Sequence, residues 1–165
     1  MSKNNEFDIT LNQFRDYLST ILKVYQDLIP VLKSELEAVQ KDDIDSLNEC
    51  LKSQQALLIL TRNFDTKIDE YQTKLNITAA NLSELILKLP DDKQLTFFEI
   101  LSQFGQTSAE VRFYQEKCRL LLQSKLYLID KVLSKTKIPK DNITYNKDAA
   151  EVQGSLFSKA LEIKI

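Results

Sequence analysis

Apolar residues recur at steps of three and four along most of this chain, which is the period of helices that bury one face. The longest stripe runs from Phe97 to Leu133 and predicts a helix of about 50 Å, at 1.5 Å per residue. Its members before the interruption at Lys125 are Phe97, Leu101, Phe104, Val111, Tyr114, Cys118 and Leu121, and Leu128 and Val132 follow. Gly105 is the weakest point, and the pattern leaves open whether the helix bends there. So long a helix is stable in water only where other elements cover its stripe.

The first part of the chain carries a second stripe, from Leu11 to Val39, which predicts a long first helix. Pro30 lies inside this stripe. Proline lacks the N–H that a helix interior uses, and its ring crowds the preceding turn. Because the stripe continues in register beyond it, we expect a kink at Pro30 and not the end of the helix.

A polar segment, residues 40–43, separates the first helix from the next one. So short a connection leaves room only for a tight reversal, and either Asp42 or Asp43 is a natural N-cap. We therefore expect an antiparallel hairpin whose second helix runs from Ile44 to about Asn76, followed by a short third helix. The predicted fold class is all-α, an antiparallel bundle in which this hairpin and the short helix cover the long last helix.

The pattern changes after Lys135, where residues 136–165 show little periodicity until a brief amphipathic end at 155–165. Burying the five large apolar side chains of that end at ~2 kcal/mol each yields about 10 kcal/mol. Ordering its backbone and side chains at ~1.5 kcal/mol per residue costs about 16 kcal/mol. We therefore expect a helical bundle at residues 1–135 and a flexible tail at residues 136–165.

Composition fits a few long helices and excludes several function classes. The 165 residues include two glycines and three prolines, too few turn residues for a sheet protein. The net charge is −2 with both signs interspersed, whereas nucleic-acid binding calls for a clustered basic face. No apolar run approaches the 18 residues of a membrane helix, and the first residues lack a signal-peptide core. We expect a cytoplasmic protein with no nucleic-acid partner and no membrane insertion.

The sequence shows no catalytic or metal-binding constellation. Histidine is absent, so a Ser-His-Asp or Cys-His arrangement cannot form. Cys50 and Cys118 are too few and too far apart for a disulfide framework or a zinc site, and are expected to be small buried residues. Glu35 and Glu37 are expected on solvated helix faces. We therefore expect no cofactor, no metal and no enzymatic activity.

Three aromatic residues point instead to protein partners. Phe98 and Phe113 fall off the main stripe of the last helix, so they either meet the short helix or remain exposed as part of a partner groove. Tyr145 is isolated in the polar tail, which is typical of a short recognition segment. Function is therefore to be sought on helix surfaces and in the tail.

The hairpin and the tail together resemble the FlgN-like cytosolic export chaperones of the bacterial flagellum. The resemblance rests on the segment Glu35–Leu47, an acidic and alanine-bearing helix end followed by a short acidic reversal and a leucine. Lys52 and the pair Leu57-Leu58 follow in the second helix. The long last helix and the tail segment Thr144–Lys147 are also similar, so the likeness covers nearly the whole chain in layout.

This resemblance implies a non-enzymatic chaperone that binds the helical termini of the hook–filament junction proteins FlgK and FlgL, prevents their premature assembly and delivers them to the export gate. An apolar strip completed by a guest helix suits this task. The candidate residues for client binding are Val111, Tyr114, Leu121, Leu128, Val132, Leu156, Phe157 and Leu161. The resemblance makes Tyr145 the candidate for export-gate binding.

Two alternatives stay open at this point. The alternative for the five candidate residues on the last helix is that they are ordinary members of the intramolecular core. The alternative function is a helical scaffold or adaptor module that bridges proteins or self-associates, in this case through a face formed by Phe98 and Phe113.

Overall fold

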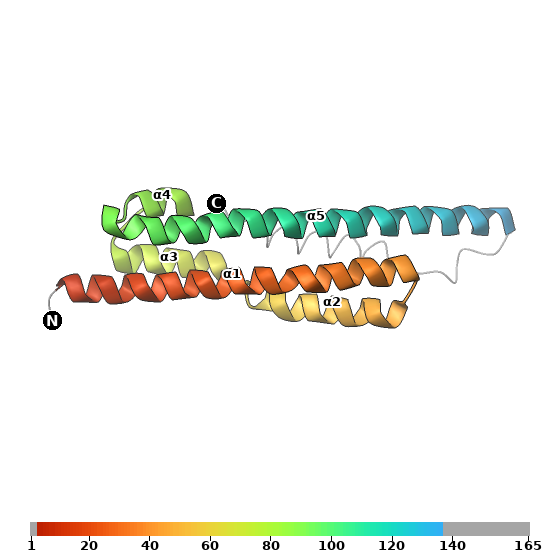
Figure 1. The fold of residues 1–165 in the computed structure, drawn as a ribbon, viewed down its shortest axis with the longest axis horizontal. Helices are drawn as coiled ribbons and strands as arrows, with labels where there is room; N and C mark the ends of the chain where they lie inside the picture. The colour runs from red at the N-terminus through yellow and green to blue at the C-terminus, as the bar shows by residue number, and fades with distance from the viewer. Residues whose placement is uncertain (1–2, 137–165) are drawn as a thin grey trace.

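The computed structural model describes residues 3–136, which form helices only, so the all-α class is confirmed for this part of the chain. The helices are α1 (Lys3–Lys41), α2 (Ile44–Ile59), α3 (Phe64–Leu75), α4 (Leu82–Leu87) and α5 (Asp91–Thr136). Figure 1 shows α1 and α5 side by side, with α2 and α3 end to end along α1 and α4 against the first turns of α5. The expected tail at 136–165 lies, apart from its first residue, outside the described residues.

The two long helices run parallel to each other. Phe14 of α1 stacks on Phe97 near the start of α5, with ring centroids 5.4 Å apart. Further along both helices, Sγ of Cys118 lies 3.8 Å from the carbonyl oxygen of Leu32. The parallel arrangement follows from the connection, because α2 and α3 return the chain to the end at which α1 begins (Figure 1).

The tight reversal after α1 forms as predicted. Asp43 is the N-cap of α2, and its carboxylate accepts a hydrogen bond of 3.0 Å from the backbone N–H of Ser46. Asp42 adopts the left-handed conformation with φ 57°, which aspartate tolerates better than most residues. These two residues close the hairpin of α1 and α2 without a glycine.

The prediction of one helix from Ile44 to Asn76 is wrong, because the helix is interrupted at residues 60–63 between α2 and α3. The backbone hydrogen bonds there tighten to the i→i+3 type. The Thr61 hydroxyl donates to the carbonyl oxygen of Leu58 at 2.9 Å, and such side-chain bonds compete with regular helix geometry. The end at Asn76 is confirmed, since this residue is the left-handed C-cap of α3.

Both long helices continue through their expected weak points. Pro30 lies inside α1, and α5 shows no interruption at Gly105. A Cβ atom built on Gly105 would meet nothing within 4 Å, so no close contact requires a glycine there. The helix tolerates the cost of about 1 kcal/mol relative to alanine because buried neighbours such as Phe104 anchor it on both sides.

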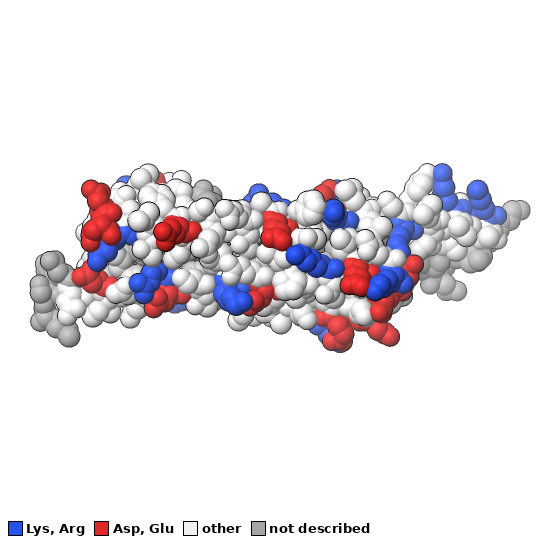
Figure 2. Space-filling view, in the orientation of Figure 1, with Lys and Arg blue, Asp and Glu red and all other residues white. Residues whose placement is uncertain are grey.

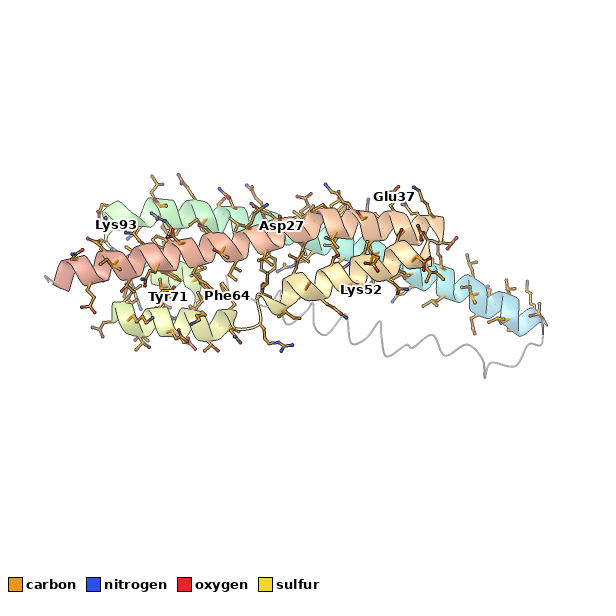
Figure 3. The ribbon with its side chains drawn as sticks, turned by 90° about the horizontal axis from the view of Figure 1, so that it is seen from below. Asp27, Glu37, Lys52, Phe64, Tyr71 and Lys93 are labelled. Carbon is orange, nitrogen blue, oxygen red and sulfur yellow. The ribbon has the colours of Figure 1, made fainter. Side chains whose placement is uncertain are left out.

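The half of the bundle that contains α3 has an aromatic core. Phe64 and Tyr71 point from α3 toward α1 (Figure 3), where Tyr71 lies 5.0 Å from the ring of Phe14. Tyr25 meets Phe104 of α5 edge-on at 5.9 Å. Aromatic pairs in these geometries add stability beyond the apolar area that they bury. This half therefore fixes the register between α1 and α5.

The half that contains α2 is packed differently and corrects one prediction. Glu35, expected on a solvated face, is only 6% exposed, and its carboxylate accepts a hydrogen bond of 2.5 Å from Nε2 of Gln54. Glu35 lies three residues after Leu32 and four before Val39, so the core-facing side of α1 includes it. Glu37 is exposed and paired with Lys41, as expected of a solvated face. The core of this half thus contains a buried polar contact.

Candidate partner-binding site

The last part of α5 projects beyond the rest of the bundle (Figure 1). Nζ of Lys125 pairs with the carboxylate of Asp42 and lies 3.4 Å from the carbonyl oxygen of Gln40, at the last turn of α1. Because α1 and α5 are parallel and α1 ends at Lys41, the following residues of α5 have no part of α1 beside them. We call residues 126–136 the projecting end; at 1.5 Å per residue it is about 16 Å long.

The projecting end exposes large apolar side chains. Five of them are about half exposed or more: Leu126 50%, Tyr127 58%, Leu128 60%, Ile129 49% and Val132 60%. An isolated exposed leucine is ordinary, but a contiguous group on one helix marks an interaction surface. The projecting end is therefore the candidate functional site.

This apolar surface continues the side of α5 that faces the core. Ile129 follows the buried Cys118 by about three helical turns, and Val111 precedes Ile129 by about five, so the three residues lie on one side of the helix. Val132 is three residues beyond Ile129 on the same side. The side of α5 that α1 covers along the bundle thus extends past the end of α1 with no described element against it.

The structure separates the predicted client-binding residues of α5 into three groups. Leu128 and Val132 lie on the projecting end, each 60% exposed. Val111 is fully buried in the core, so its side chain offers no surface in this state. Tyr114 and Leu121 are half-buried along the bundle. The remaining predicted site residues lie outside the described residues: Tyr145, Leu156, Phe157 and Leu161.

Sequence reasoning missed two residues of this surface, Leu126 and Ile129, and also the exposed Tyr127, which points to the other side of the helix. The interruption at Lys125 was a signal for them, because this lysine meets the last turn of α1 where the core ends. The lengths were a second signal, since α1 has 39 residues and α5 has 46. Without knowledge that the two helices are parallel, the sequence alone did not say which end of α5 would lack cover.

The two off-stripe phenylalanines do not form one exposed face. Phe98 is partly buried and packs against the core cluster. Phe113 is 53% exposed, and Nζ of Lys117 lies 4.5 Å from the centre of its ring. The surface proposed for self-association is therefore reduced to Phe113 and its immediate neighbours.

The cysteines are placed for packing and not for chemistry. Cys118 is buried and Cys50 is half-buried, so the expected buried position is confirmed for Cys118 only. Burial, aided by the charge of Glu35, raises the pKa of the Cys118 thiol to about 12. Burial also raises the pKa of Cys50. Both thiols stay protonated near neutral pH and are poor nucleophiles.

Residues 3–136 offer little else that resembles a site. No three His, Cys, Asp or Glu residues in this range gather as metal ligands would. No helix in the same range is both long and apolar enough to cross a bilayer. A shallow depression on α2, lined mainly by polar residues between Asp45 and Lys52, is wide open to solvent.

Comparison with known proteins identifies the family of the chain. Residues 1–153 match the family described as FlgN protein, a match that includes all five helices. None of the curated proteins or solved structures compared with the chain gives a match. Because the family match spans well over half of the sequence, the chain belongs to the FlgN family of flagellar export chaperones for hook-associated proteins, which are not enzymes.

Proposed function

We propose that the projecting end of α5 holds a terminal helix of a hook–filament junction protein, FlgK or FlgL, and so prevents its premature assembly. The observation that carries this proposal is the exposed apolar side of residues 126–136, which continues the core-facing side of α5. An amphipathic helix laid along such a strip buries its own apolar side in the same way as α1 does along the bundle. We place this step in the cytoplasm, before export.

The projecting end alone is too small for tight binding. Covering a side chain that is already about half buried recovers about 1 kcal/mol, or about 4 kcal/mol for the four apolar residues on that side, Leu126, Leu128, Ile129 and Val132. A micromolar complex needs about 8 kcal/mol, after the losses of freedom on association. A client helix must therefore make further contacts.

We assign these further contacts to Tyr114 and Leu121 along α5 and to Leu156, Phe157 and Leu161 of the tail. The half-buried side chains of Tyr114 and Leu121 lie on α5 before the projecting end, so a longer client helix meets them next. The three tail residues are among the five large apolar residues of the amphipathic end of the sequence. A segment that orders only on binding adds contact area at an entropic cost, which keeps the complex releasable.

Delivery to the export gate is assigned to Tyr145. It stands apart from the apolar residues given to the client, so the gate and the client use different residues of the chain. An aromatic residue in a short polar segment is a common anchor for a transient partner. On this proposal, Tyr145→Ala weakens binding to the cytoplasmic domain of the export gate and leaves client binding unchanged.

The test is co-expression of the full chain with a junction protein that carries or lacks its terminal helix. Size-exclusion chromatography with light scattering should show a one-to-one complex only when the terminal helix is present. A chaperone that elutes alone in both cases contradicts the proposal. Self-association that is abolished by Phe113→Ala and unaffected by the client would instead favour the scaffold function.

A further inference from the structure

The projecting end carries two lysines beside its apolar strip, Lys131 and Lys135. Within residues 3–136, Lys131 and Lys135 form no ion pair, and Figure 2 shows basic side chains on the visible side of this end. Lysines on the body of the bundle mostly have a carboxylate partner, in five cases three or four residues away in the sequence: Lys23–Asp27, Lys41–Glu37, Lys52–Glu49, Lys67–Glu70 and Lys88–Glu84. Lys74 and Lys117 likewise form no ion pair in this range, so what sets Lys131 and Lys135 apart is their place beside the exposed apolar strip.

These two lysines lie along one edge of the apolar strip. Lys131 is three residues after Leu128, and Lys135 is three residues after Val132, so each lysine stands beside an exposed apolar side chain. The two lysines are themselves four residues apart and therefore point the same way. Asp130, the acidic residue of this segment, lies on the opposite edge of the strip.

We infer that the partner helix is acidic along the edge that meets Lys131 and Lys135, with carboxylates three or four residues apart beside its apolar stripe. This inference rests on the proposed function, since it specifies the chemistry of the helix held there. Nζ of Lys131 lies 4.6 Å from the centre of the Tyr127 ring, on the flank of the helix next to Leu128, and the exposed ammonium stays in water. Charges on the rim of an apolar contact select partners and register more than they add affinity.

The probes are two synthetic amphipathic peptides with the same leucine stripe, one with a glutamate pair four residues apart along one edge and one with lysines there. Binding to the full chain is measured by fluorescence anisotropy for the wild type and for Lys131→Glu/Lys135→Glu. The matched control is Lys52→Glu/Lys67→Glu, which reverses two exposed lysines on α2 and α3. All three proteins are checked for helicity by circular dichroism.

We expect the wild type and the control to prefer the acidic peptide by about tenfold, as two rim ion pairs allow. The variant Lys131→Glu/Lys135→Glu should invert this preference, and added salt should reduce it in every protein. Equal binding of the two peptides by the wild type, binding of neither, or an unchanged preference in the variant overturns the inference. Sedimentation with phosphatidylglycerol vesicles but no peptide preference would also overturn it, in favour of a membrane surface.

A second arm separates this inference from the proposed function. The terminal helix of a junction protein is titrated into Leu128→Gln/Val132→Gln and into Lys131→Glu/Lys135→Glu. Loss of binding in Leu128→Gln/Val132→Gln only would support the proposed function and contradict an acidic edge on the client helix. Unchanged binding in both variants would remove the proposed function as well.

Discussion

Nε2 of Gln54 donates a hydrogen bond of 2.5 Å to the carboxylate of Glu35, and this contact joins α2 to α1 inside the bundle. Gln54 is the one residue of α2 that is fully buried, while the leucines of α2 are half-buried. A polar contact thus occupies the position where an apolar layer is usual. Buried polar contacts of this kind add little net stability, but removing one partner is costly.

The first prediction concerns this contact. Gln54→Ala leaves the buried carboxylate of Glu35 without its donor and should lower the free energy of unfolding by about 2 kcal/mol. Gln55→Ala is the matched control, because the neighbouring side chain is exposed and should change stability by less than about 0.5 kcal/mol. Urea unfolding followed by circular dichroism measures the free energy of unfolding of both variants. Equal losses in the two would contradict a stabilising role for the contact between Gln54 and Glu35.

The second prediction is a pH dependence. Burial raises the pKa of Glu35 above its ordinary value of 4.5, and the bond from Gln54 lowers it in part. The folded protein then holds this proton more tightly than the unfolded chain, so its contribution to stability falls as the pH rises from 4.5 through the raised pKa. Glu35→Gln removes the titration, and its stability relative to wild type should improve across that window.

The control for this titration is Glu37→Gln. The hydrogen bond from Lys41 lowers the pKa of the exposed Glu37 below 4.5, so its stabilising contribution is present above that pH and is lost below it. Its variant should therefore lose relative stability as the pH rises, the reverse of Glu35→Gln. Unfolding curves measured at several pH values decide the matter, and parallel trends for the two variants would contradict the buried state of Glu35.

The third prediction uses two valines of one helix. Val111→Ala removes a fully buried side chain and should lower the free energy of unfolding by about 2 kcal/mol. Val132→Ala, at a position that is 60% exposed, should change it by less than about 0.5 kcal/mol. Thermal melting of both variants checks this contrast. A similar loss in the two proteins would mean that the projecting end belongs to the folded core.

The fourth prediction concerns residues 137–165. Ordering the amphipathic end of the tail costs more than its apolar residues return on burial. A chain that ends at Thr136 should therefore keep its helicity and melt within a few degrees of the full chain, while it binds a junction protein more weakly. Circular dichroism and a pull-down measure the two properties. A large drop in melting temperature would place the tail in the core.

Periodicity was enough to predict the helical class and the hairpin, because an amphipathic stripe and an aspartate cap are local features. The break at residues 60–63 was not predictable in the same way, since the chain has neither glycine nor proline there and the Thr61 hydroxyl acts through local competition. The burial of Glu35 was missed because charge alone suggests solvent. Its partner Gln54 is on another helix.

The candidate site was only partly predictable for a related reason. Leu128 and Val132 were identified from the stripe, but the same stripe included Val111, which is buried. A helical pattern shows which side of α5 is apolar and not how far α1 extends beside it. That limit is set by the contact of Lys125 with the last turn of α1, which depends on the register between helices far apart in the sequence.

The most direct measurement is isothermal titration of the terminal-helix peptide of a junction protein into the full chain and into Leu128→Gln/Val132→Gln. The control is Ile59→Gln/Leu60→Gln, which changes two apolar residues of the same exposure, 60% and 61%, away from the projecting end. The projecting-end variant should bind at least about tenfold more weakly, because covering each lost side chain is worth about 1 kcal/mol. Equal affinity in the wild type and both variants would contradict a client helix on α5.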